Sequence, residues 1–243
     1  MASTKHRAGD VMKTDGGEGP GIWGSIGWLI LFFFLQGLTS VLAGMWRAYE
    51  VGPGQEVVLD ARFGTLLSIA LLTSAAAIIA LLRKRLLIDT AKRIHQNWWK
   101  MGGILLLAVI AFNMVYGSIF LGDRLAQPEM VILIEAARTS ILSGIVVFAT
   151  VVFVAPIAEE LLFRGLLQPA IEKRFGPWPS IIVPAIFFGA IHLQPLAAPP
   201  LILVGVILGW LRWKTDSLTV PIAFHIAMNA VAFITMFFGL MPQ

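Results

Sequence analysis

An apolar stretch between about residues 141 and 167 contains three charged side chains, and this combination constrains the fold most. Glu159, Glu160 and Arg164 are each costly at the centre of a lipid bilayer unless they are paired or hydrated. On a helix, Glu160 and Arg164 lie four residues apart and can pair on one face, whereas Glu159 points about 100° away from Glu160. Pro156 removes a backbone hydrogen bond just before the pair, so we expect a kink there. The stretch therefore predicts a membrane helix with a buried ion pair and a carboxylate that is free for chemistry.

Long apolar runs recur along the rest of the chain. Of the 243 residues, 58% are hydrophobic and only 13% are charged, whereas a soluble domain carries roughly 25% charged residues. The runs approach twenty residues and lack the strict alternation of barrel strands, so the spans are expected to be helices. The sequence therefore predicts an all-α fold, a polytopic transmembrane helix bundle.

The apolar runs and the turn residues between them predict seven spans with a cytoplasmic N-terminus. The segment 83–100 is the most basic part of the chain, so it is expected to lie in the cytoplasm, as an amphipathic helix on the membrane surface. The segment 122–138 mixes acidic and basic residues and is expected to be an external loop. The predicted spans are approximately residues 23–45, 63–82, 102–121, 140–174, 180–193, 201–211 and 218–240.

Three parts of the chain differ in character. Residues 1–20 are polar and Gly-rich, and they predict a disordered cytoplasmic N-terminus. Residues 21–135 supply the first spans and the basic interfacial segment. Residues 136–243 hold the intramembrane polar side chains and form the predicted catalytic core.

Three further polar side chains lie in the apolar second half, namely His192, His225 and Asn229. Glu159 and His192 lie about 16 residues before and after the turn at Phe175, so an antiparallel hairpin places them at the same depth. His225 and Asn229 are four residues apart and share one face of the last helix. Each of these side chains, taken alone, could simply form a hydrogen bond to a neighbouring helix without any catalytic role. Their common level favours one shared site.

These residues resemble three motifs of the CPBP intramembrane proteases, the family of CAAX prenyl endopeptidases and bacteriocin-processing enzymes. The first motif is Glu159-Glu160-x-x-x-Arg164, the second is Phe188-x-x-x-His192, and the third is His225-x-x-x-Asn229. The resemblance covers about residues 140–235. It implies that Glu159 and His192 activate water and that His225 and Asn229 stabilise the oxyanion, roles that suit amide hydrolysis. We expect Glu160 and Arg164 to hold the long helix in register and Phe188 to line the cavity.

Two mechanisms remain open for such a site. Glu159, His192 and His225 are also a familiar ligand set for catalytic zinc, with water in the fourth position. No His-Glu-x-x-His motif is present, however, and we favour a glutamate mechanism without a cofactor. The chain has no cysteine, which excludes a thiol nucleophile and thiolate metal ligands.

The sequence thus predicts an intramembrane endopeptidase that acts on a lipidated or membrane-associated peptide. The expected substrate is a prenylated CAAX-type terminus or a leader-bearing precursor, and membrane lipid is the other expected partner. We find no motif for nucleic acid and no signal for an oligomeric state. The expected location is a prokaryotic cytoplasmic membrane. The alternatives are a proton- or ion-coupled transporter and a non-catalytic immunity protein that only binds its partner.

Overall fold

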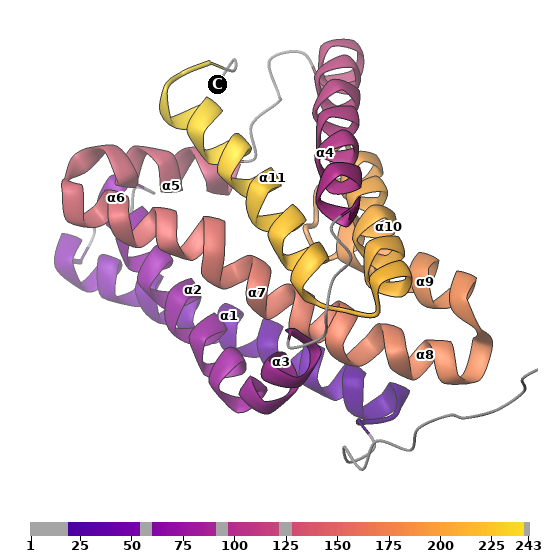
Figure 1. Ribbon diagram of the computed structural model, residues 1–243. Helices are drawn as coiled ribbons and strands as arrows, with labels where there is room; N and C mark the ends of the chain where they lie inside the picture. Colours follow the sequence, from indigo (N-terminus) through magenta and orange to yellow (C-terminus); the bar gives the residue numbers. More distant parts are fainter. Residues whose placement is uncertain (1–18, 54–59, 91–96, 122–127, 241–243) are drawn as a thin grey trace, which may run out of the picture.

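The computed structural model describes residues 19–53, 60–90, 97–121 and 128–240. Helix is the only regular secondary structure within these ranges, which confirms the predicted all-α fold (Figure 1). The helices are α1 (Ile22–Val51), α2 (Ala61–Leu81), α3 (Arg83–Thr90), α4 (Asn97–Tyr116), η1 (Gly117–Leu121), α5 (Pro128–Thr139), α6 (Ile141–Phe148), η3 (Ala149–Val154), α7 (Ala155–Glu160), η4 (Leu161–Leu167), α8 (Gln168–Phe175), α9 (Pro177–Ala190), α10 (Ala198–Thr215) and α11 (Thr219–Phe237).

The described part of the chain contains five helices that are long and apolar enough to cross a membrane. They comprise residues 22–51, 61–85, 97–120, 141–175 and 219–237. This finding agrees with an integral membrane helix bundle. The remaining two predicted spans correspond to α9 and α10, which are not among the five. The count of seven spans and the cytoplasmic N-terminus therefore stay predictions.

One helix of 35 residues crosses the whole molecule, from Ile141 to Phe175. It is a composite of the α-helical segments α6, α7 and α8, which are joined by the π-helical stretches η3 and η4. Pro156 lies in the first turn of α7, directly after η3. Proline has no N–H to donate, and a π-helical stretch is one of the ways in which a helix accommodates such a break. The predicted long helix is confirmed, π-helical turns lie on both sides of the segment that contains Pro156, and the kink expected there stays a prediction.

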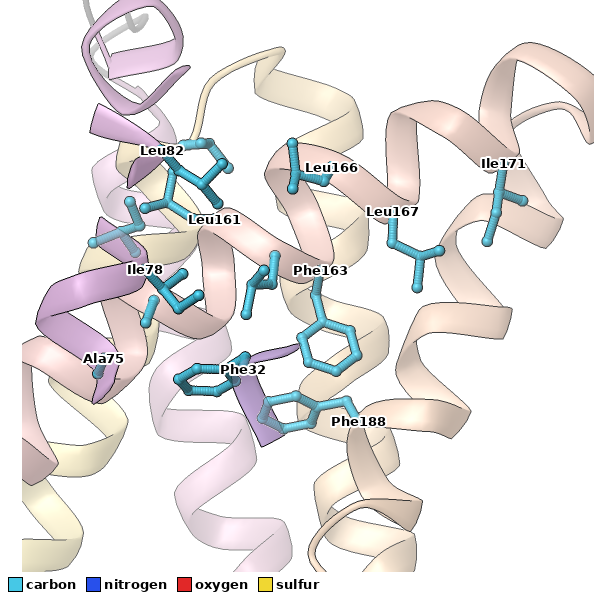
Figure 2. Packing of buried hydrophobic residues seen from close by; sticks show 14 residues of the cluster. Phe32, Ala75, Ile78, Leu82, Leu161, Phe163, Leu166, Leu167, Ile171 and Phe188 are labelled. Atoms are coloured by element: carbon cyan, nitrogen blue, oxygen red, sulfur yellow. The ribbon is translucent and has the colours of Figure 1, made fainter. Parts of the chain in front are cut away.

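The main hydrophobic core surrounds the middle of this long helix. Leu161, Leu162 and Phe163 are completely buried there, against Phe32 of α1 and Ile78 of α2 (Figure 2). The charged residues Glu160 and Arg164 lie at the same level of the helix and are equally buried. The core therefore encloses the ion pair that was predicted from the sequence.

Helices α9 and α10 form a closely packed pair beside the long helix. A Cβ atom at Gly205 would lie only 2.9 Å from Ala185 Cα, and one at Gly189 would lie 2.5 Å from Ile202 Cγ1. Small residues at such positions let two membrane helices approach closely. The close approach brings the backbone of α10 within reach of side chains on the long helix.

The prediction of an external loop up to residue 138 is wrong, because Pro128–Thr139 forms helix α5. Its buried face carries apolar side chains such as Leu133 and Ile134. Arg138 donates hydrogen bonds to the carbonyl oxygens of Met236 and Phe237 at the end of α11. Basic side chains favour such positions because the last carbonyls of a helix lack intrahelical partners. Glu135 and Arg138 thus belong to a helix that binds the end of another helix, whereas residues 122–127 lie outside the described ranges.

Other boundaries also differ from the predictions. The helix expected at residues 201–211 extends over Ala198–Thr215, and α9 ends at Ala190 rather than at residue 193. Within the basic segment 83–100, α3 ends at Thr90 and α4 begins at Asn97, and the residues between them lie outside the described ranges. The predicted disorder of residues 1–20 also falls almost entirely outside these ranges.

The predicted topology can be tested because the chain has no cysteine. A single Thr90→Cys or Arg174→Cys substitution should react with a membrane-impermeant maleimide only from the cytoplasmic side, since basic segments stay inside. A Gln243→Cys substitution should react only from outside. Labelling of the cysteine at position 90 from outside alone would contradict the seven-span arrangement.

Candidate active site

Glu160 and Arg164 form a completely buried ion pair on the long helix. Arg164 Nη1 donates to Glu160 Oε1 over 3.0 Å, and both side chains are 0% exposed. The pair follows from the spacing of four residues, as predicted from the sequence. It allows two charges to remain in the interior, where a single unpaired charge would be costly.

The Arg164 guanidinium has partners on two further helices. Its Nη2 donates to the carbonyl oxygen of Gly205 on α10 over 2.9 Å. The guanidinium carbon also lies 5.0 Å from the ring centre of Phe188 and 5.6 Å from that of Phe163. Figure 2 shows these two rings close together, and they meet edge to face with their centres 5.6 Å apart. Arg164 therefore connects the long helix with both α9 and α10.

Glu160 also binds His225 of α11, which brings the first and third motifs together. His225 Nδ1 lies 3.0 Å from Glu160 Oε1, the oxygen that also accepts from Arg164. A carboxylate paired with an arginine can only accept, so Nδ1 is the donor and carries the proton. The other ring nitrogen, Nε2, is then available either to accept a proton or, in the imidazolium form, to donate one.

Glu159 lies beside this second nitrogen. Its Oε2 is 3.8 Å from His225 Nε2, and its side chain is 17% exposed, whereas that of Glu160 is fully buried. A separation of 3.8 Å is too long for a hydrogen bond. Within the described part of the chain, the Glu159 carboxylate makes no hydrogen bond, in agreement with the predicted free carboxylate.

His192 joins the same group through Phe188. Its Nδ1 donates to the Phe188 carbonyl oxygen over 2.7 Å, which leaves Nε2 as the acceptor in the neutral ring. The Phe188 ring lies 5.0 Å from the His192 ring and 5.7 Å from the His225 ring. His192 itself lies in the turn after α9, not within the helix as the sequence suggested. The structure thus places both imidazoles against one phenylalanine.

Asn229 lies one turn beyond His225 on α11, as predicted. Its Nδ2 donates to the carbonyl oxygen of Val151 in η3 over 2.9 Å. An amide nitrogen has two hydrogens, so one remains for another acceptor. Asn229 therefore attaches α11 to the π-helical stretch eight residues before Glu159.

A zinc site requires its ligands to surround one point. Among the described residues, no group of three or more His, Asp or Glu side chains could hold a metal ion. The alternative ligand set Glu159, His192 and His225 is therefore not gathered for coordination in this arrangement. The reaction proposed for this site uses only side chains of the protein.

Sequence reasoning missed three hydrogen bonds that join the long helix to α10 near the ion pair. Gln168 Nε2 donates to the Gly209 carbonyl oxygen over 2.8 Å, and Arg212 Nε donates to the Arg164 carbonyl oxygen over 3.3 Å. The third is the bond from Arg164 to the carbonyl oxygen of Gly205. Gln168 could have been noticed, because it continues the four-residue spacing of Glu160 and Arg164. Backbone carbonyls carry no signal in the sequence.

Comparisons with known proteins agree with this geometry. Residues 141–231 match a family described as type II CAAX prenyl endopeptidase Rce1-like. The matched region contains all three motifs and ends two residues after Asn229. It confirms the resemblance seen in the sequence.

A similar curated protein is an uncharacterized 24.3 kDa protein of Escherichia coli. It is 31% identical over 122 residues, which make up 47% of this chain and 56% of that protein. The chain thus spans little more than half the length of this relative. No solved structure matches.

Proposed function

We propose, from the membership of residues 141–231 in the Rce1-like family of type II CAAX prenyl endopeptidases, that this integral membrane protein is an intramembrane endopeptidase. The observation that carries the proposal is the difference between two adjacent carboxylates. Glu160 is bound by Arg164 and His225, whereas Glu159 is partly exposed beside His225 Nε2 and has no hydrogen bond within the described ranges. A general base must be uncommitted and accessible to water.

In the proposed reaction, the Glu159 carboxylate takes a proton from a water molecule. The water oxygen attacks the carbonyl carbon of the peptide bond, and the carbonyl oxygen becomes an oxyanion. The amine then leaves with the proton that Glu159 holds, so the site returns to its starting charge. His192, whose Nε2 is an acceptor, helps to orient the water.

His225 and Asn229 are the proposed donors to the oxyanion. Because Glu160 fixes a proton on Nδ1 of His225, a hydrogen bond from Nε2 requires the imidazolium form. Asn229 contributes the amide hydrogen that Val151 does not use. Donors that are held in place before the reaction stabilise developing charge most effectively.

The proposed substrate is a membrane-inserted or lipid-associated peptide, either prenylated at a CAAX-type terminus or carrying a leader. We propose a prokaryotic cytoplasmic membrane as the location, supported by the similarity to an Escherichia coli protein. Purified protein in liposomes should cleave a fluorescence-quenched peptide from a panel with and without a prenyl group. No cleavage of any peptide, together with ion flux across the liposome membrane, would favour a transporter instead.

The proposed mechanism needs no metal ion, and this can be measured. Prolonged dialysis against a chelator should leave the cleavage rate unchanged, because Glu159 performs the task of a metal in activating water. Elemental analysis of the dialysed protein should find far less than one zinc per chain. Stoichiometric zinc that is lost together with activity, and restores it when added back, would contradict the mechanism.

A further inference from the structure

Three buried polar atoms lie along one face of the long helix without a partner. Glu160 Oε2, Arg164 Nε and Gln168 Oε1 have no hydrogen-bond partner among the described residues, and the three residues are at most 1% exposed. They follow one another at intervals of four residues, so they extend over roughly 12 Å of helix. Buried polar atoms in native proteins almost always bind a protein group or an ordered water molecule.

This face of the helix packs against α10 at Gly205 and Gly209, two residues that have no side chain. Gln168 donates to the Gly209 carbonyl oxygen and Arg164 to that of Gly205. A Cβ atom at Gly209 would lie 3.5 Å from Gln168 Oε1. Glycine at position 209 therefore leaves space beside the unpartnered acceptor.

The polar contacts continue from these residues to the solvent. Arg212 Nε donates to the Arg164 carbonyl oxygen, and Arg212 Nη1 pairs with Asp216 Oδ1 at 3.0 Å. The Arg212 side chain is only 9% exposed, whereas that of Asp216 is 77% exposed. In the opposite direction, Glu160 binds His225, whose Nε2 faces Glu159. A continuous set of polar groups thus joins an exposed carboxylate to the candidate active site.

We propose that Glu160, Arg164, Gln168 and Arg212, here named the polar seam, bind a file of ordered water molecules that leads from Asp216 to the site. A water molecule can accept from Arg164 Nε–H and donate to Gln168 Oε1 or to Glu160 Oε2, so donors and acceptors balance. The role of these water molecules, which is to supply the hydrolysis reaction, rests on the proposed function. Hydrolysis consumes one water molecule for each bond broken, and the file would supply it from the inner side of the site, where Glu160 and Arg164 are fully buried.

The positions of the waters can be tested without any activity. A crystal structure of the full chain from a lipid phase, at a resolution that shows ordered water, should place a water oxygen about 3 Å from each of the three atoms. The proposal fails if these atoms pair with protein groups instead, or if no ordered water lies beside them. This outcome does not depend on whether the protein cleaves peptides, so it is separate from the proposed function.

The supply of water can be tested with two substitutions. Gln168→Leu removes the acceptor together with the hydrogen bond to the Gly209 carbonyl oxygen, and Gly209→Ala places a methyl group against the acceptor while keeping the Gln168 side chain. Both should lower kcat about tenfold, the effect of losing one well-placed hydrogen bond, with KM nearly unchanged. The melting temperature should fall in Gln168→Leu, which loses a buried hydrogen bond, and fall less in Gly209→Ala, so an equal loss of kcat in both variants is not explained by stability. Ile171→Val, a conservative change in the core contact of the same helix, should leave kcat unchanged. If both Gln168→Leu and Gly209→Ala keep the full kcat, the polar seam does not supply water to the site.

Discussion

Replacing Glu159 by Gln is expected to lower the rate of peptide hydrolysis at least about a hundredfold, which is the usual scale for the loss of a general base. The amide has nearly the size of the carboxylate but cannot take a proton from water. The measurement is kcat with a quenched peptide, beside the binding of the same peptide at equilibrium. Binding should persist, because the substitution changes the chemical step rather than the cavity.

The stability of the Glu159→Gln variant should remain close to that of the original chain. The Glu159 side chain is partly exposed and makes no hydrogen bond within the described part of the protein, and its buried neighbour His225, 3.8 Å away, keeps its bond to Glu160. Glu172→Gln is a matched control, since it makes the same chemical change near the end of the same long helix. It should keep full activity. An active Glu159→Gln variant would move the search for the base to Glu160.

The ion pair shows what could be predicted from the sequence. A spacing of four residues on a helix is a local property, so Glu160 and Arg164 could be paired without knowledge of the fold. The bond from His225 to Glu160 joins residues 65 positions apart, and it exists only because α11 packs across α7. From the sequence, Glu160 could therefore be assigned to the ion pair that holds the long helix, but not to the hydrogen bond that fixes the proton on His225.

Helix α5 and His192 show where the reasoning from patterns stops. The mixed charges before residue 139 suggested a loop, but a helix needs only one apolar face, and Leu133, Ile134, Ala136 and Ala137 provide it. His192 was expected in a helix that would end near Leu193. The structure ends α9 at Ala190 and turns through Leu193, whose φ is +54°. A left-handed backbone at leucine is uncommon and has no signature in the sequence.

Counting residues along helices predicts a depth for a side chain but not its contacts. Counting residues on either side of the turn at Phe175 placed Glu159 and His192 at one level, because helices rise by a constant distance per residue. The structure places both His192 and His225 against Phe188, and His225 against Glu159. The lateral contacts depend on side-chain rotation and on the π-helical turns of the long helix, which residue counting does not capture.

Replacing Arg164 by Ala is expected to reduce the stability of the folded protein by about 3–5 kcal/mol, the typical cost of breaking a buried ion pair. Glu160 would keep its bond from His225 but would lose its full countercharge in the interior. The Gly205 carbonyl oxygen and the rings of Phe163 and Phe188 would lose their cationic partner as well. The yield of folded protein and its melting temperature in detergent measure this effect.

Two further arginine substitutions test whether the loss of stability comes from the buried ion pair itself. Arg164→Lys keeps a positive charge near Glu160 but cannot reproduce the planar, forked geometry that also reaches Gly205, so its stability should lie between those of Arg164→Ala and the original chain. Arg174→Ala removes an exposed arginine from the end of the same helix, and it should change stability by no more than about 0.5 kcal/mol. The activity lost in Arg164→Ala should follow the loss of folded protein. A variant that folds with the original melting temperature yet hydrolyses nothing would instead make Arg164 part of the reacting site.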